Sequence, residues 1–232
     1  SYLKTVMDFA FFDRINQAKH EETDDWWNGM NRIYNVLCYD YLYPNPKSVM
    51  AFIENHDTDR FLGEGKDTLA LKQALALLLT VNRIPQLYYG TEILMNGTKS
   101  VTDGYVRKDF PGGWAGDARN AFTAKGRTKA QNDMFGWISR LLHWRQGNDV
   151  ITKGSQTQFC TQHGVYVVAR QYNGKSVMTV INGRNAAAEL DVKRYAEIIG
   201  NAEKAVDVTT GRNVVISHNV KLSPRQTMVL EF

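Results

Sequence analysis

The sequence is poor in cysteine, with two among 232 residues, and these two lack the spacing of a metal site. Cys38 falls in a helical pattern and Cys160 in a strand-like one, so two free buried thiols are the simplest expectation. No apolar stretch reaches the length of a membrane-spanning helix. No signal-peptide pattern follows Ser1.

The sequence also has no run of lysine and arginine, although its formal net charge is +4. Because the basic residues are dispersed, binding to nucleic acid or to an anionic membrane is not indicated. With 43% hydrophobic residues, the chain can bury a sizeable core. Its five tryptophans and eleven tyrosines suit stacking against sugar rings, but most aromatic residues simply fill the core.

Motifs for metal and nucleophilic chemistry are absent. The run from His56 to Asp59 places oxygen ligands close together, but it has neither the register of an EF-hand nor an H-x-x-x-H pattern. There is no nucleophile elbow and no phosphate-binding glycine loop. We therefore expect no metal ion and no other cofactor.

Two segments, Phe52–Asp57 and Pro85–Glu92, have the pattern of short buried strands that end in polar residues. The apolar run Leu69–Val81 between them predicts a helix, which gives the β-α-β order of a parallel sheet. In a parallel α/β barrel the carboxyl ends of the strands build the active site. The pattern therefore predicts that four polar residues lie at such an edge: Asn55, His56, Asp57 and Glu92.

The same segments carry a family resemblance. Phe52–Asp57 follows F-x-x-N-H-D, Pro85–Glu92 follows P-x-L-Y-Y-G-x-E, and Lys108–Trp114 reads K-D-F-P-G-G-W. In this order and spacing they resemble the seventh and eighth barrel strands, and the loop beyond, of the α-amylase family (glycoside hydrolase family 13), in its neopullulanase-like and cyclomaltodextrinase-like branch. Residues 1–12 resemble the sixth strand, so the resemblance covers essentially the whole chain.

The resemblance implies an α/β fold followed by an all-β fold. Residues 1–147 would be the C-terminal part of a catalytic (β/α)8 TIM barrel, strands six to eight, and residues 148–232 a C-terminal antiparallel β-sandwich. Family members carry a nucleophilic Asp after the fourth strand and an acid/base Glu after the fifth, and no matching run occurs here. Their calcium ligands also lie in the earlier half. We therefore expect a fragment that is inactive alone and whose open strand edges pair with another copy or with the missing half.

Local patterns support this organisation. Apolar residues at helical spacing predict helices from Met30 to Tyr41, over Leu69–Val81 and from Met134 to Leu142. Gly147-Asn148-Asp149 breaks the helical pattern and marks the predicted domain boundary. Beyond it, Asn173-Gly174 predicts a hairpin turn between strands 165–172 and 176–181. Further strands are expected at residues 187–192, 206–209, 214–217 and 227–232.

The resemblance gives Asp57 the role of a third carboxylate, distinct from the nucleophile and acid/base pair that lies roughly 5 to 5.5 Å apart in retaining enzymes. Asp57 would hydrogen-bond the hydroxyls of the sugar being cleaved and stabilise the transition state; the alternative is a turn cap. His56 would donate to the same hydroxyls, or be a packed residue. Asn55 either orients the motif through backbone hydrogen bonds or contacts sugar. The Glu54 side chain should point to the opposite face of the strand from its neighbours and have a structural role.

Three more residues are candidates for substrate binding. Arg60 either pairs with Asp57 or Asp59 and touches an outer sugar, or forms a plain surface ion pair. Glu92 either supports the site or anchors a loop, and Tyr88 and Tyr89 beside it either support the site or fill the barrel interior. Trp114 either stacks on a glucose unit or pins its glycine-rich loop.

The predicted function is therefore that of a retaining α-glucan hydrolase acting on α-1,4 and, as an open alternative, α-1,6 linkages of starch, pullulan or cyclodextrins. Transglycosylation is the second hypothesis, since it differs only in whether water or a sugar hydroxyl takes the intermediate. A non-catalytic sugar-binding or interaction module is the third. The expected partner is an α-glucan, with no nucleic acid.

Overall fold

The computed structural model of the chain describes residues 3–22 and 25–232. Its helices are α1 Phe9–Ala18, α2 Asn31–Cys38, α3 Thr68–Thr80, α4 Asp103–Val106, α5 Lys129–Arg145, α6 Asp149–Lys153 and α7 Ala196–Ile199. The 3-10 helices are η1 Tyr39–Leu42, η2 Pro46–Ser48, η3 Thr91–Ile93, η4 Ala124–Gly126 and η5 Val192–Tyr195. The strands are β1 Met50–Phe52, β2 Ile84–Gln86, β3 Ser155–Gln162, β4 Val165–Tyr172, β5 Lys175–Asn182, β6 Ala188–Leu190, β7 Lys204–Asp207, β8 Arg212–Val215, β9 Val220–Leu222 and β10 Thr227–Glu231.

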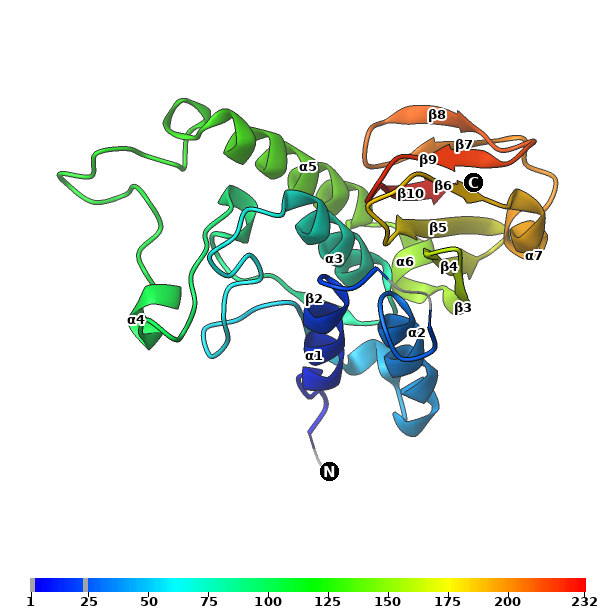
Figure 1. Cartoon of the computed structure of the whole chain (residues 1–232), viewed down its shortest axis with the longest axis horizontal. Helices are drawn as coiled ribbons and strands as arrows, with labels where there is room; N and C mark the ends of the chain where they lie inside the picture. The colour runs from blue at the N-terminus through cyan, green and yellow to red at the C-terminus, as the bar shows by residue number, and fades with distance from the viewer. Residues whose placement is uncertain (1–2, 23–24) are drawn as a thin grey trace.

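Helices and parallel strands form the first part of the chain, and antiparallel strands form the second. Figure 1 shows the β part on the right, beside α3 and α5, and a long arm extending to the left. This arm consists of residues 107–128, between α4 and α5. No helix in residues 3–22 and 25–232 is both long and apolar enough to cross a membrane.

Three backbone segments run parallel in the first part. β1 pairs with β2 in the register Met50 to Ile84, and Met7 forms an isolated parallel bridge with Met50 on the other side. The Asp8 amide donates to the Met50 carbonyl at 2.8 Å, and the Ile84 amide donates to the Val49 carbonyl at 2.9 Å. The order across this small sheet is therefore the order along the chain, as successive β-α-β units produce.

The predicted strand over residues 1–12 is wrong in its second half. Ser1 and Tyr2 lie outside the described residues, and α1 begins at Phe9. Asp8 ends the extended segment because its carboxylate accepts a hydrogen bond from the Phe11 amide at 2.9 Å, which caps the helix. Phe11, Ile15 and Ala18 then recur at helical spacing and are buried.

The three predicted helices are confirmed. The helix expected from Met30 to Tyr41 is α2, which tightens into η1 for its last turn. α3 is buried on nearly all sides, including every residue from Leu75 to Leu79, and Asp67 caps it by accepting from the Ala70 amide at 2.9 Å. α5 starts with a capping box between Thr128 and Gln131.

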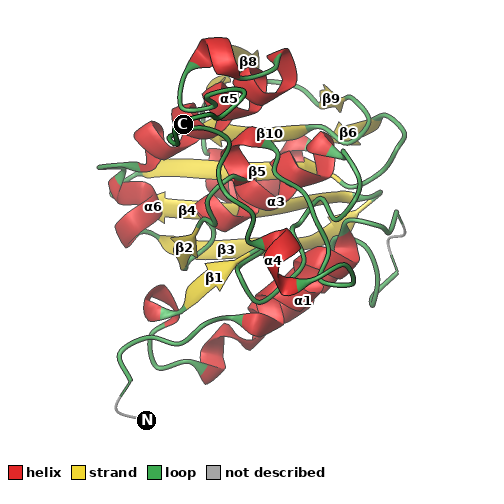
Figure 2. Ribbon diagram, turned by 90° about the vertical axis from the view of Figure 1, so that its left-hand side faces the viewer, coloured by secondary structure: helices red, strands yellow, loops and turns green. Residues whose placement is uncertain are grey.

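The antiparallel part consists of one six-stranded sheet in the order β3-β4-β5-β10-β7-β8 and a two-stranded sheet of β6 and β9. Figure 2 shows β3, β4, β5 and β10 side by side. Strands occur near every predicted range, with edges displaced by up to two residues for β7 and β8. β3 and β9 lie outside the predicted strand ranges, although Cys160 in β3 falls in a strand-like pattern.

Both faces of the six-stranded sheet are covered, and the side chains alternate between them with period two. In β4, Val165, Val167 and Ala169 face a core shared with β6, β9, η5 and α7, while Tyr166 and Val168 face a core shared with α3 and α5. The second layer of the predicted sandwich is therefore a two-stranded sheet with a short helical segment.

Polar contacts fix α3 to the sheet. Gln73 donates to the Asn182 carbonyl at 2.7 Å, and Thr179 donates to the Thr80 hydroxyl at 2.7 Å. Arg170 is buried and donates to the Thr80 carbonyl at 3.0 Å; burial lowers the pKa of its guanidinium to about 10. One apolar core includes residues on both sides of the predicted boundary between residues 147 and 148. The division into two domains at this position therefore stays a prediction.

The hairpin turn offers a stability prediction. Asn173 and Gly174 have φ of +48° and +76°, as a type I′ turn requires, and they join β4 to β5. Gly174→Val should destabilise the protein by roughly 1 to 3 kcal/mol, because a β-branched residue is strained at positive φ. Asn173→Gly is the matched control and should change stability by less than about 0.5 kcal/mol. Urea unfolding of both variants measures this, and an unchanged Gly174→Val midpoint would contradict it.

Candidate functional site

The site is built on the turn that follows β1. The Asn55 side chain is buried and accepts a hydrogen bond from the Asp57 amide at 2.8 Å. The Thr58 hydroxyl closes the turn by accepting from the Asn55 amide at 2.9 Å. Asn55 therefore shapes the turn that presents His56 and Asp57, which fits the orienting alternative for this residue.

His56 and Asp57 project from the turn with 58% of each side chain exposed. The Nε2 atom of His56 lies 3.1 Å from Oδ2 of Asp57. The other carboxylate oxygen, Oδ1, lies 3.0 Å from Nη2 of Arg107. The turn thus presents one acceptor group between two donor groups on an open surface, an arrangement that suits neighbouring hydroxyls of a ligand.

A second segment, residues 99–107, holds this turn from the side. Arg107 donates through Nε to the His56 carbonyl at 2.8 Å, so it contacts both exposed residues. Lys99 donates through Nζ to the Asp57 carbonyl at 3.1 Å, and its amide donates to Oδ1 of Asp59 at 2.6 Å. Asp103 links the two cations, 3.2 Å from Lys99 and 3.6 Å from Arg107.

Sequence reasoning missed Arg107. It lies 50 residues from Asp57, directly before the K-D-F-P-G-G-W run. Its position beside that motif was the available signal. The motif alone, however, does not indicate which of its neighbours folds back onto the turn.

A buried polar cluster supports the turn from below. Glu54 is buried, and its carboxylate accepts from the Phe61 amide and from the Thr91 hydroxyl. Burial raises the pKa of Glu54, against the lowering effects of these hydrogen bonds and of Arg60. This confirms the structural role expected of Glu54.

The predicted pairing of Arg60 with Asp57 or Asp59 is wrong. Its side chain is fully buried, and Nη1 lies 3.5 Å from Oε1 of Glu54. Arg60 also donates to the Tyr89 carbonyl at 2.6 Å and to the Val106 carbonyl at 3.0 Å. Because the Arg60 side chain points inward, this geometry does not support a contact between Arg60 and sugar. Arg60 instead links the turn to Tyr89, which follows β2, and to Val106 in α4.

Two tyrosines cover the buried guanidinium. The Arg60 guanidinium lies 4.0 Å from the ring centre of Tyr88 and 4.9 Å from that of Tyr89. Burial raises the pKa of Tyr88 to about 12, and its hydrogen bond with Tyr89 adds to this. The two rings meet edge to face with centres 4.6 Å apart. The two tyrosines therefore pack over the Arg60 guanidinium.

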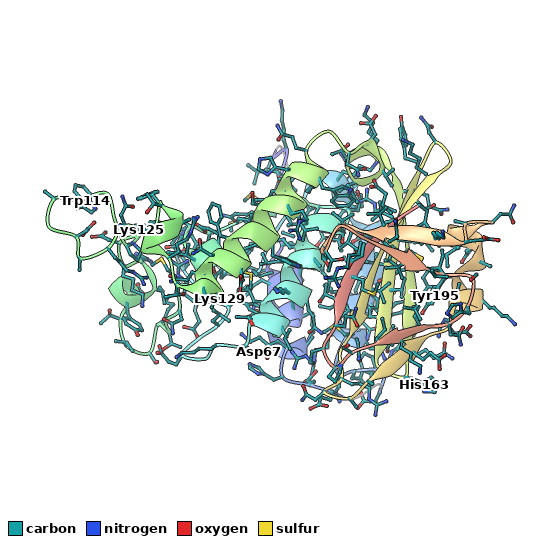
Figure 3. All side chains as sticks on the ribbon, turned by 90° about the horizontal axis from the view of Figure 1, so that it is seen from above. Asp67, Trp114, Lys125, Lys129, His163 and Tyr195 are labelled. Carbon is teal, nitrogen blue, oxygen red and sulfur yellow. The ribbon has the colours of Figure 1, made fainter. Side chains whose placement is uncertain are left out.

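Among the described residues, neither Glu92 nor Trp114 forms a hydrogen bond or an ion pair with the turn. Glu92 is half-buried in η3, and within residues 3–22 and 25–232 its carboxylate makes no ion pair. Trp114 is 72% exposed and lies at the end of the arm, away from His163 and Tyr195 at the opposite end of the molecule (Figure 3). A role in substrate binding for either residue stays a prediction.

The arm has a defined backbone at its base. Gly112 has φ of +115°, and a Cβ atom there would lie 2.7 Å from the Cα of Asn120. The Phe110 and Phe122 rings pack with centres 4.6 Å apart. The close approach of Asn120 explains the glycine at position 112, and Gly113 also has a positive φ, +102°.

The surroundings of the turn are open. A hollow of about 570 Å³ lies between α1 and residues 59–67, but neither His56 nor Asp57 lines it. Among the described residues there is no cluster of three or more His, Cys, Asp or Glu side chains that could hold a metal ion. The turn therefore forms an exposed surface with hydrogen-bonding groups.

The chain is similar to cyclomaltodextrin glucanotransferases and α-amylases. The profile of the Cyclo-malto-dextrinase C-terminal domain family matches residues 156–231. The chain is 25% identical over 240 residues to a cyclomaltodextrin glucanotransferase of Paenibacillus macerans, covering 98% of this chain and 30% of that protein. An α-amylase of Niallia circulans is 25% identical over 222 residues, covering 92% of this chain and 38% of that protein. The chain thus spans about a third of the length of these relatives.

Solved structures with the same fold cover the whole chain. An α-amylase of Geobacillus thermoleovorans in complex with acarbose matches with a TM-score of 0.75 and 20% identity, over 99% of this chain and 48% of that one. An Anoxybacillus α-amylase matches with a TM-score of 0.74 and 19% identity, over 99% of this chain and 47% of that one.

Proposed function

The chain is a member of the α-amylase family, glycoside hydrolase family 13, with a cyclomaltodextrinase-type C-terminal domain, and from this premise we propose that it is part of a retaining α-glucan hydrolase. The observation that carries the proposal is the exposed Asp57 carboxylate, held between His56 and Arg107 after a parallel strand. Such a group can accept from sugar hydroxyls as positive charge develops on the ring.

The parallel segments would be the sixth, seventh and eighth strands of a (β/α)8 barrel. Two observations support this part of the proposal. The segments at Met7, β1 and β2 lie in chain order with parallel register, and α3 connects β1 to β2. The likeness to α-amylase structures extends over 99% of the chain, including this region.

The catalytic centre would be shared with segments that this sequence does not include. The relatives are about three times as long as the region that matches, which leaves room for them. We place the nucleophile and the acid/base there, and refer to the longer protein as the complete enzyme. Asp57 would then stabilise the transition state, His56 would bind the same sugar, and Asn55, Arg60 and Arg107 would hold the turn.

The substrate would be an α-1,4-linked glucan, with α-1,6 linkages, pullulan and cyclodextrins as further candidates.

The test is an assay on a chromogenic maltooligosaccharide. The complete enzyme should hydrolyse it, while the 232-residue chain alone should show no turnover. Hydrolysis by the chain alone at a typical amylase rate would contradict the division of the catalytic centre. An inactive complete enzyme that still binds maltooligosaccharides would favour a non-catalytic sugar-binding module.

Transglycosylation is a second candidate function, favoured by one observation. Several matched relatives are cyclomaltodextrin glucanotransferases, including those of Niallia circulans and Geobacillus stearothermophilus. Product analysis after reaction with starch separates the two functions. Linear short maltooligosaccharides would support hydrolysis, and cyclic or longer products would support transfer.

Residue Arg107 provides a prediction for the complete enzyme. Arg107→Ala should lower kcat by roughly tenfold to a hundredfold, because misplacing a catalytic group by about 1 Å costs on that order. Arg107→Lys should recover part of this, since one ammonium cannot hold both Asp57 and the His56 carbonyl. Arg119→Ala, an exposed arginine of the arm, is the control. An unchanged kcat in Arg107→Ala would contradict the positioning role.

Exposed apolar groups at the parallel strands support an association proposal. Val6 and Phe9 are 44% and 50% exposed next to the Met7 bridge. Uncovered strand edges recruit partners. We expect the isolated chain to form dimers or larger species by light scattering. A stable monomer at 26.4 kDa would contradict this expectation.

A further inference from the structure

Several asparagines of the chain are directly followed by glycine, namely Asn28, Asn96, Asn173 and Asn182. In such a pair the backbone nitrogen of the glycine can attack the asparagine side chain, because glycine has no Cβ that would hinder the approach. The product is a five-membered succinimide, and asparagine is one of the thermolabile residues. The fold decides which pair can react, since the attack needs a free glycine amide and an asparagine side chain that can turn.

The pair Asn182-Gly183 is held inside the protein. Asn182 is fully buried, and its side-chain amide donates to the carbonyls of Ala186 and Ser223, each at 2.9 Å. The Gly183 amide donates to the Gly164 carbonyl at 2.9 Å. Succinimide formation at Asn182 would break all three of these hydrogen bonds.

The pair Asn28-Gly29 is tied to two carboxylates and a guanidinium. The Gly29 amide donates to the Glu21 carboxylate at 2.8 Å. The Asn28 side chain donates to the Asp25 carboxylate at 2.7 Å and accepts from Arg32 at 2.9 Å. Neither the nucleophile nor the side chain that it would attack is therefore free.

The pair Asn96-Gly97 is held through its glycine. Gly97 is buried, its amide donates to the Gly63 carbonyl at 2.8 Å, and its carbonyl accepts from the Arg60 amide at 3.0 Å. The Tyr105 ring packs so closely that a Cβ atom at Gly97 would lie 3.1 Å from it. The backbone at this glycine therefore cannot turn without breaking these contacts.

The pair Asn173-Gly174 has none of these restraints. Both residues are exposed at the tip of the β4–β5 hairpin. Over residues 3–22 and 25–232, neither the Gly174 amide nor the Asn173 side chain has a hydrogen-bond partner. The pairing of Tyr172 with Lys175 closes the hairpin next to the tip, so the turn can open without unpairing the rest of the sheet.

We propose that Asn173 is a site of spontaneous deamidation, with water as the co-reactant. The Gly174 nitrogen forms a bond to Cγ of Asn173, the Cγ–Nδ2 bond breaks, and ammonia leaves with the proton of the Gly174 amide. Water then opens the succinimide at one of its two carbonyls. One product is aspartate, and the other is isoaspartate, in which the main chain runs through the side-chain carbons. Each product adds one negative charge.

The two products should affect the sheet differently. Asp-Gly is itself a favoured pair for a type I′ turn, so aspartate keeps the hairpin. Isoaspartate lengthens the backbone of a two-residue turn, which disturbs the register that pairs Tyr172 with Lys175. Because β4 and β5 are inner strands of the six-stranded sheet and contribute to both apolar cores, isoaspartate should lower the stability of the protein.

The test incubates the folded 232-residue chain at mildly alkaline pH and follows all the Asn-Gly pairs by peptide mapping with mass spectrometry. Asn173 should deamidate at least about tenfold faster than Asn28, Asn96 or Asn182, because the other pairs must first break hydrogen bonds. The chain unfolded in guanidinium chloride is the matched control. There the preference for Asn173 should disappear, since the hydrogen bonds that protect the other pairs are gone.

Urea unfolding gives a second readout that separates the two products. The midpoint of the incubated chain should fall as its isoaspartate content rises, whereas freshly prepared Asn173→Asp should keep the midpoint of the fresh chain. Asn173→Gly cannot form the succinimide at this position, and its midpoint should not change on incubation.

Two results would overturn the inference, and neither depends on enzymatic activity. In the folded chain, deamidation at Asn173 that is no faster than at the other pairs would remove the site. Isoaspartate at position 173 without any change in the unfolding midpoint would refute its effect on the hairpin.

Discussion

Asp57→Asn is expected to lower the turnover number of the complete enzyme on maltooligosaccharides by on the order of a hundredfold or more, by analogy with the loss of one oxyanion-hole donor. The substitution keeps the shape of the side chain but removes its negative charge. The lost interaction is one that strengthens as the sugar ring gains positive charge, so kcat should fall more than the affinity for substrate.

The neighbouring carboxylate provides the control for this experiment. Asp59 is exposed, and its Oδ1 accepts from the Lys99 amide, a contact that the amide oxygen of Asn can also make. Asp59→Asn should therefore retain nearly normal turnover. Steady-state kinetics on a chromogenic maltooligosaccharide measure both variants. Near-normal turnover in Asp57→Asn would remove Asp57 from the catalytic residues.

Arg60→Met is expected to have the largest effect on stability, about 3 to 5 kcal/mol, because it leaves the Glu54 carboxylate buried without its cation. Glu54 and Arg60 have 2% and 0% of their side chains exposed, so solvent cannot compensate. The variant also loses the hydrogen bonds from Arg60 to Tyr89 and Val106. Urea unfolding followed by circular dichroism gives the change in unfolding free energy.

The loss should depend on pH in a defined direction. Burial already raises the pKa of Glu54, and removing Arg60 should raise it further. A carboxyl with a raised folded-state pKa contributes stability that is present below its unfolded pKa and is lost as pH rises through the folded value. The cost of Arg60→Met should therefore be greater at pH 8 than at pH 5. The double variant Glu54→Leu/Arg60→Met should recover much of it, and an equal loss at both pH values would contradict this account.

The helices and the hairpin that the sequence predicts correctly are each marked by a strong local sequence pattern. α3 is an apolar run behind a capping aspartate, α5 begins with a capping box, and the Asn173-Gly174 turn needs positive φ at two residues that tolerate it. The polar turn after β1 was located by its motif, since Asn55, His56 and Asp57 are neighbours in sequence. Each of these patterns lies within about twenty consecutive residues, so interactions between neighbours in sequence determine the structure of that segment.

Two features differ from the sequence prediction, one set by a local cap and one by distant contacts. Phe9 to Phe12 read as a strand because the capping role of Asp8 was not recognised, although Phe11, Ile15 and Ala18 give the helical spacing. Arg60 was placed beside Asp57, but its contacts with Tyr89 and Val106 come from segments 29 and 46 residues away. The inward direction of that side chain is a property of the assembled fold, which adjacency in sequence does not reveal.

The proposed role of Asp57 is to bind the transition state of glycosidic cleavage more tightly than it binds the substrate. Its most direct test compares two ligands of the complete enzyme, the inhibitor acarbose, taken as a mimic of the transition state, and maltotriose, a ground-state ligand. Asp57→Asn should weaken acarbose inhibition by on the order of a hundredfold while changing maltotriose affinity by less than about tenfold. Equal weakening of both ligands, or no change in either, would contradict the claim.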